Sequence, residues 1–154
     1  VPEGRLYVNP YPSGAVEKAQ DAYDGAVLAG MEGGVVALYQ KCVHLGCRVP
    51  WCKASQWFEC PCHGSKYNQA GEYELGPAPR GMDRFHVEIS GGRVMVDTSE
   101  VVLGPPRGTD TIDQPPQGAA GPRLDDRAAA GRLRSRRPGA ATGAGAGAGA
   151  SGAR

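Results

Sequence analysis

Two short boxes of cysteine and histidine constrain this chain more than any other feature. The first reads Cys42-Val43-His44-Leu45-Gly46-Cys47, and the second reads Cys60-Pro61-Cys62-His63-Gly64-Ser65-Lys66-Tyr67. Together they contain four of the 5 cysteines and two of the 3 histidines. Thiolates and imidazoles are common metal ligands, and chance grouping explains their clustering poorly. We therefore expect the chain to be organised around a metal site held by the two boxes.

The residue types in the boxes narrow the choice of metal. Thiolates and imidazoles suit zinc, copper or an iron-sulfur cluster, whereas hard cations prefer oxygen ligands. A structural zinc site usually pairs Cys-x2-4-Cys with His-x3-5-His or with a second cysteine pair, and neither box has that form. Each box instead offers one cysteine and one histidine at close spacing, Cys42 with His44 and Cys60 with His63, plus one further cysteine.

This pattern resembles the Rieske family, in which two cysteines bind one iron of a [2Fe-2S] cluster and two histidines bind the other. The resemblance makes Cys42 and Cys60 the thiolate ligands, and His44 and His63 the imidazole ligands. It covers residues 33–97 well and weakens toward both ends. Both boxes, their order and their separation agree with the family, and a zinc site remains the alternative.

Other positions indicate the branch of the family that the chain resembles. Cys47 and Cys62 correspond to cysteines that form a disulfide between the two cluster-binding loops in cytochrome bc and bf complexes; buried free thiols are the alternative. The segment Gly64-Ser65-Lys66-Tyr67 matches a segment of the family in which the serine and tyrosine hydroxyls donate hydrogen bonds to a bridging sulfide and to a ligand cysteine sulfur. The segment Gly76-Pro77-Ala78-Pro79 matches the proline loop that covers the cluster in this family. The segment Val49-Pro50-Trp51 is similar to the plastoquinol-oxidising members.

The resemblance implies a chemistry that suits quinol oxidation. Two thiolates and two neutral imidazoles leave the oxidised cluster neutral, so it accepts an electron more readily than a four-cysteine cluster. Each ligating imidazole keeps a second nitrogen that can carry a proton, so His44 or His63 is expected to contact the quinol. Leu45 is expected at an exposed tip that packs on a partner subunit, with plain loop packing as the alternative.

We therefore expect the iron-sulfur subunit of a bacterial quinol:cytochrome c reductase, with cytochrome b and a c-type cytochrome as partners and no nucleic acid partner. By itself the domain would be an electron carrier on the extracytoplasmic side of the cell membrane. The chain starts at Val1 and has no run of 18 apolar residues, so we interpret it as a piece that lacks its membrane anchor. The rivals are a soluble Rieske ferredoxin-like carrier, the small subunit of another oxidoreductase such as arsenite oxidase, and a zinc-stabilised interaction module.

The hydrophobic pattern predicts an all-β domain. Strands are expected around Leu6 and Val8, over 34–40 and 56–59, and in a hairpin of 84–90 and 93–97 around Gly91-Gly92. A short helix is expected over 15–22, followed by a glycine-punctuated segment. The family resemblance implies a Rieske-type antiparallel β base that carries a cluster-binding subdomain of about residues 40–80.

Composition divides the chain into four segments. We expect an N-terminal strand and short helix in 1–32, the Rieske domain in 33–97, an irregular Pro/Gly-rich segment in 98–118, and a disordered Arg/Gly/Ala-rich tail in 119–154. Residues 1–118 hold 10 Lys and Arg against 14 Asp and Glu, net −4, whereas 119–154 hold 7 Arg against 2 Asp, net +5. Such a tail could contact anionic lipid or nucleic acid or be a passive extension. Of the remaining candidates, Cys52 is expected to be a small buried residue, with a reactive thiol as the alternative if it is exposed, and His86 is expected to be a solvent-facing strand residue.

Overall fold

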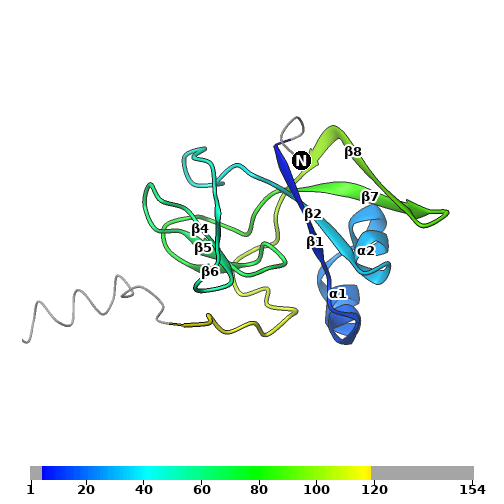
Figure 1. Cartoon of the computed structure of the whole chain (residues 1–154), viewed down its shortest axis with the longest axis horizontal. Helices are drawn as coiled ribbons and strands as arrows, with labels where there is room; N and C mark the ends of the chain where they lie inside the picture. The colour runs from blue at the N-terminus through cyan, green and yellow to red at the C-terminus, as the bar shows by residue number, and fades with distance from the viewer. Residues whose placement is uncertain (1–4, 119–154) are drawn as a thin grey trace, which may run out of the picture. The chain divides into compact units, whose positions relative to one another are not determined.

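The computed structural model describes residues 5–118, which form two antiparallel sheets of four strands each (Figure 1). The first sheet contains, in spatial order, β1 (Leu6–Pro10), β2 (Val35–Tyr39), β7 (Arg84–Ser90) and β8 (Arg93–Val102). The second contains β3 (Trp51–Cys52), β4 (Trp57–Glu59), β5 (Lys66–Tyr67) and β6 (Tyr73–Leu75). The expected all-β class is confirmed, and the expected strands appear as β1, β2, β4, β7 and β8.

Strand β2 is buried on both faces, which explains why its sequence is a continuous apolar run. Val36 and Leu38 contribute to the main core with Phe58 and Tyr67 of the second sheet. Ala37, between them, belongs to a second cluster whose other buried members are Leu6, Phe85 and Val87. The chain that leaves this rigid strand is the first cysteine-histidine box.

Two helices lie on the other side of β2 from the second sheet in the view of Figure 1. The predicted helix is confirmed as α1 (Val16–Ala22), which follows a 3-10 turn at Ser13–Ala15. A second helix, α2 (Gly25–Glu32), occupies the segment predicted to be merely glycine-punctuated, so the expectation of one helix in 1–32 was wrong. Gly30 of this helix has a packing role, because a Cβ at this position would lie 2.8 Å from the Cβ of Val87.

The predicted hairpin is confirmed, with Ser90 paired to Arg93 across a two-residue turn. Both turn residues, Gly91 and Gly92, have positive φ (56° and 74°), as a type I′ turn requires. Strand β8 continues to Val102, beyond the predicted end at Asp97, so the irregular segment begins later than expected. The strand lies at the edge of its sheet with mostly exposed side chains, so it needs no alternating apolar pattern.

A buried carboxylate joins the segment after β8 to the rest of the domain. Glu72, which is fully buried, accepts hydrogen bonds from the Tyr23 hydroxyl (2.8 Å), from Nδ2 of Asn68 (2.8 Å) and from the backbone N–H of Thr111 (2.9 Å). These bonds satisfy a charge that burial alone would make costly. The predicted disordered tail, 119–154, lies outside the described residues. No helix within 5–118 combines the length and apolar character needed to span a bilayer.

Candidate metal centre

The two boxes form loops with the same backbone hydrogen-bond pattern. In the first loop, Cys42 N–H donates to the carbonyl of Cys47 (2.7 Å) and Gly46 N–H donates back to the carbonyl of Cys42 (2.9 Å). In the second, Cys60 N–H donates to the carbonyl of Ser65 (2.8 Å) and Gly64 N–H donates to the carbonyl of Cys60 (3.1 Å). Both glycines have positive φ (84° and 79°), which favours glycine. Each loop therefore presents its cysteine and histidine on a similarly closed turn.

The two predicted thiolate ligands are buried and lie close enough to influence each other. Cys42 is 2% exposed and Cys60 is 3% exposed. Burial raises the pKa of the Cys60 thiol, and its side-chain hydrogen bond with Cys42 raises that pKa further. Two thiolates at this spacing would repel each other, so a cation bound between them is the natural means of holding both deprotonated.

The two predicted imidazole ligands also come together. The rings of His44 and His63 have centroids 4.9 Å apart and are nearly perpendicular, at 88°. His44 is half-buried and His63 is exposed, so this pair lies nearer the surface than the thiol pair. The structure thus brings together the members of each predicted ligand pair, one member from each loop.

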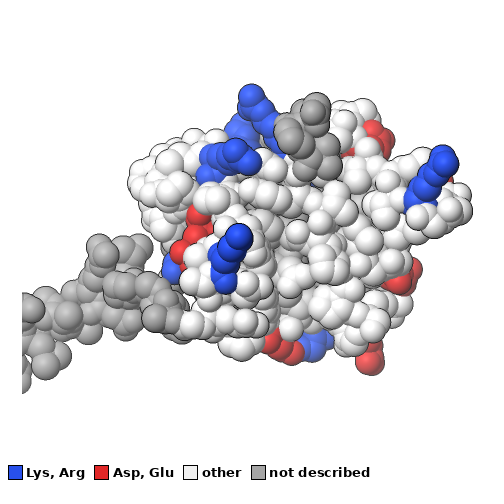
Figure 2. All heavy atoms as spheres, viewed as in Figure 1, with Lys and Arg blue, Asp and Glu red and all other residues white. Residues whose placement is uncertain are grey.

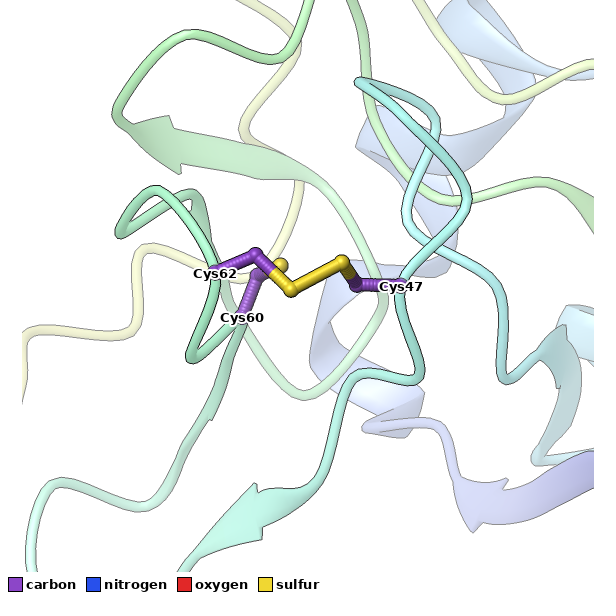
Figure 3. A group of neighbouring side chains, drawn as sticks. All are labelled: Cys47, Cys60 and Cys62. Carbon is purple, nitrogen blue, oxygen red and sulfur yellow. A yellow bond between two sulfur atoms is a disulfide. The ribbon is translucent and has the colours of Figure 1, made fainter.

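A disulfide connects the two loops, as predicted. Figure 3 shows Cys47 joined to Cys62, with the thiol of Cys60 beside them; the Cα atoms of the bonded pair are 6.6 Å apart. The sulfur atoms of all three cysteines lie within 4.8 Å of one another. Because the disulfide sulfurs cannot act as thiolates, only Cys60 of this group is available to a metal. The disulfide fixes the spacing of the loops that carry the predicted ligands.

Two buried hydroxyls, those of Tyr67 and Ser65, lie beside the ligand loops, and that of Tyr67 contacts sulfur. The Tyr67 hydroxyl is 3.3 Å from Sγ of Cys42. Burial raises the pKa of Tyr67, and the contact with Cys42 adds to the shift, so the phenol keeps its proton and remains a donor. Ser65 Oγ accepts a hydrogen bond from Ala78 N–H (3.1 Å), and the Ser65 side chain also hydrogen-bonds with Tyr67.

The predicted covering loop packs tightly against the second ligand loop. A Cβ at Gly76 would lie 2.6 Å from the Cα of Ser65, so only glycine permits this approach. Pro77, next to it, is exposed, as is Leu45 at the tip of the first loop, which is 70% exposed. Both are therefore accessible to a partner.

Sequence reasoning missed Arg107, which holds the covering loop in place. Its Nε donates to the carbonyl of Ala78 (2.8 Å) and its Nη2 donates to the carbonyl of Gly76 (3.1 Å). Its guanidinium also lies over the ring of Tyr73, 4.3 Å from the centroid. No sequence signal pointed to this role, because the residue stands in an irregular Pro/Gly-rich segment.

The remaining cysteine, Cys52, lies outside the two loops. It is half-buried on β3, so the expectation of a buried residue was wrong. Hydrogen bonding with the Ser55 side chain is the main cause that lowers the pKa of its thiol. His86, on β7, is half-buried and lies opposite Asp97 of β8 in the strand register.

The donor set fits a two-iron cluster with mixed ligation. Two neighbouring thiols and two neighbouring imidazoles make one soft sulfur pair and one nitrogen pair, which is the ligand set of a [2Fe-2S] centre with mixed ligation. The fold and site therefore define an iron-sulfur domain. Residues 12–87 match the family model of the Rieske [2Fe-2S] domain. Residues 12–87 therefore form a Rieske domain, which binds one [2Fe-2S] cluster.

Relatives support the expected similarity to cytochrome bf subunits. The chain is 51% identical over 55 residues to the chloroplastic cytochrome b6-f complex iron-sulfur subunit of Bigelowiella natans, covering 36% of this chain and 22% of that one. It is 35% identical over 85 residues to the cytochrome b6-f complex iron-sulfur subunit of Chlorobaculum tepidum, covering 55% and 47%. The plasma membrane Rieske protein PetC3 from Synechocystis PCC 6803 is 37% identical, covering 42% and 66%, with a TM-score of 0.39. The chain spans less than half the length of these two curated relatives.

Proposed function

We propose that this chain carries the electron-transfer domain of a membrane quinol:cytochrome c reductase of the bc or bf type. It accepts one electron from quinol, together with a proton, and passes the electron to a c-type cytochrome. The observation that carries the proposal is the disulfide between Cys47 and Cys62, which ties the two ligand loops together. The resemblance associates this disulfide with quinol-oxidising members. The relatives named as cytochrome b6-f iron-sulfur subunits support the same assignment.

The ligand assignment follows the pairing of side chains. In this proposal Cys42 and Cys60 bind one iron, and His44 and His63 bind the other. When bound, the cluster supplies a one-electron acceptor that is neutral in its oxidised form. The hydroxyls of Ser65 and Tyr67 donate toward sulfur, which stabilises added negative charge there and raises the reduction potential.

The exposed side of the site is the proposed quinol contact. His63 is exposed and His44 is half-buried, so an imidazole nitrogen on this side can accept a hydrogen bond from a quinol hydroxyl. Leu45 at the tip offers an apolar surface for a partner subunit. Gly64 turns the second loop, and Pro77 on the covering loop shields the site from water.

The proposed partners are cytochrome b, which forms the quinol site, and a c-type cytochrome, which receives the electron. The proposal places the domain on the extracytoplasmic side of the cell membrane, attached through an anchor outside residues 5–118. The wider complex is then the enzyme, and this domain is its electron carrier.

Equilibration with a quinol tests the proposal directly. The cluster-loaded, oxidised protein is mixed anaerobically with a short-chain plastoquinol, and loss of visible absorbance reports reduction. We expect substantial reduction by the quinol, followed by full reoxidation when a c-type cytochrome is added. Reduction by dithionite but not by plastoquinol would contradict the proposal and would indicate a low-potential, ferredoxin-like carrier instead.

A further inference from the structure

A hollow lined by basic side chains lies beside the first ligand loop. It has a volume of about 470 Å³. Its lining includes three cations and, among the residues that the structure describes, no carboxylate: Arg5, Tyr39, Gln40, Lys41, Gly46 and Arg48. We call the three cations and the space between them the basic hollow. A hollow that contains Arg84 is also lined by Asp21 and Asp24, and an adjoining hollow that shares Lys41 is also lined by Asp83, whereas the lining of the basic hollow within residues 5–118 contains no aspartate.

The basic hollow is built into the base of the loop that carries two of the proposed ligands. Lys41 and Arg48 face each other in an antiparallel bridge that closes the loop around Cys42 and His44. Gly46 of the same loop also lines the hollow, and a Cβ there would lie 3.2 Å from Cε of Lys41. Arg5 reaches it from the start of β1. Figure 2 shows basic side chains gathered along the upper edge of the molecule, near that end of β1.

These three cations have no ion-pair partner within residues 5–118. The described salt bridges involve Lys18, Lys66 and Arg80, each with a nearby carboxylate. Arg5, Lys41 and Arg48 are all exposed instead. They also stand out against their surroundings, because residues 1–118 hold 10 basic against 14 acidic side chains, net −4. An unpaired positive group on a net negative domain is suited to recognise an anion.

We propose that the basic hollow receives carboxylates on the surface of the protein that exchanges electrons with the cluster. This inference rests on the proposed electron-transfer function. A partner close enough for electron transfer covers the exposed tip of the first loop, at His44 and Leu45. Because a typical interface buries about 800 Å² on each partner, its footprint extends from this tip to the base of the same loop. Carboxylates at that rim steer the encounter and fix the orientation of the partner.

A carboxylate is favoured over a lipid phosphate by the position of the hollow. Two guanidinium groups can each hold a carboxylate or a phosphate through two parallel hydrogen bonds, so the choice between these anions rests on position. The hollow adjoins the loop tip that an electron-transfer protein has to reach. The same cations on the flat surface of a membrane would bring that tip against lipid headgroups, where no electron acceptor of the proposed kind lies.

A synthetic hexaglutamate peptide serves as the probe. Its affinity for the cluster-loaded full chain is measured by calorimetry at low ionic strength, with Lys41→Gln/Arg48→Gln as the test variant. The matched control is Lys53→Gln/Arg93→Gln, which also removes two exposed cations that have no ion pair within residues 5–118 but leaves the basic hollow intact. We expect the test variant to bind about tenfold more weakly than wild type, and the control to bind like wild type. Arg5→Gln, which lies off the ligand loop, is expected to weaken binding about threefold.

Two results overturn the proposal. Equal weakening in the test and control variants means that the peptide senses only net charge. Binding of the wild-type chain to phosphatidylglycerol vesicles, without binding of hexaglutamate, assigns the hollow to lipid. The visible spectrum of each variant shows that the cluster is retained. Since hexaglutamate carries no electron, its failure to bind leaves the plastoquinol experiment to decide the proposed function separately.

Discussion

Removing the Tyr67 hydroxyl is expected to lower the reduction potential of the domain. The hydroxyl lies 3.3 Å from Sγ of Cys42, and the ring is fully buried, so water cannot replace the lost hydrogen bond easily. A donor at sulfur stabilises the reduced state more than the oxidised state, because the added electron increases the negative charge on the ligands. Tyr67→Phe keeps the ring and deletes only this donor.

The size of the shift follows from the strength of one charge-assisted hydrogen bond. Such a bond contributes about 1.5–3 kcal/mol when one partner is ionised. The added electron is shared among two irons and their ligands, so the hydrogen bond to the Cys42 sulfur strengthens by only about 1 kcal/mol on reduction. For a one-electron couple about 1.4 kcal/mol corresponds to ~59 mV, which gives a decrease of roughly 40 mV.

Spectroelectrochemical titration of wild type and variant measures this shift. The control is Tyr7→Phe, which also loses a tyrosine hydrogen bond, but one to the backbone carbonyl of Val49 at 3.0 Å. We expect the control potential to stay within about 10 mV of wild type. A Tyr67→Phe potential equally close to wild type, with an intact visible spectrum, would refute the assigned role of this hydroxyl.

Three further predictions concern stability, each measured by denaturant unfolding. Burial raises the pKa of Glu74 to about 7, and the carboxylate of Asp110 adds to the shift. The folded state therefore holds this proton more tightly than the unfolded chain, so stability is lost as pH rises from about 4.5 to 7, by about 1–2 kcal/mol after allowance for partial exposure. Glu74→Gln should recover that free energy of unfolding at pH 8 and little of it at pH 4. Equal effects at both pH values would contradict the predicted direction of the pH dependence. Replacing both Cys47 and Cys62 by serine should cost about 3 kcal/mol, since the bond closes a loop with a sequence separation of 15, and a loss below about 1 kcal/mol would show that packing alone holds the loops. Gly76→Ala should cost about 3 kcal/mol, because the position has a positive φ and a Cβ there clashes with Ser65. Gly91→Ala should cost about 1 kcal/mol, because that position has a positive φ but open space around it. Equal costs would show that the clash with Ser65 does not contribute.

The candidate site was predictable because its constraints are local. Metal ligands have to be particular residue types at particular spacings, so Cys42, His44, Cys60 and His63 could be proposed as ligands without any coordinates. The hairpin at Gly91-Gly92 was predictable for the same reason, since its turn type demands positive φ. The pairing of Cys47 with Cys62 came from the family resemblance, because spacing alone does not determine which cysteines bond.

What sequence reasoning missed depends on contacts between distant segments. Gly30 looks like a helix breaker, but in the structure it lets α2 approach Val87 closely, so its effect becomes clear only when β7 is in place. Arg107 supports the covering loop through carbonyls 29 and 31 residues away in sequence. The basic hollow likewise joins Arg5 to Lys41 and Arg48 through the pairing of β1 with β2.

The mixed ligation proposed for the cluster is tested most directly by electron paramagnetic resonance of the reduced, cluster-loaded chain. The measurement compares protein with natural histidine and protein with nitrogen-15 histidine, so that couplings to imidazole nitrogens can be identified. We expect a rhombic signal with a low average g value and couplings from two histidine nitrogens, with one lost in each of His44→Cys and His63→Cys. A colourless protein that contains zinc, no acid-labile sulfide and no such signal would contradict the account.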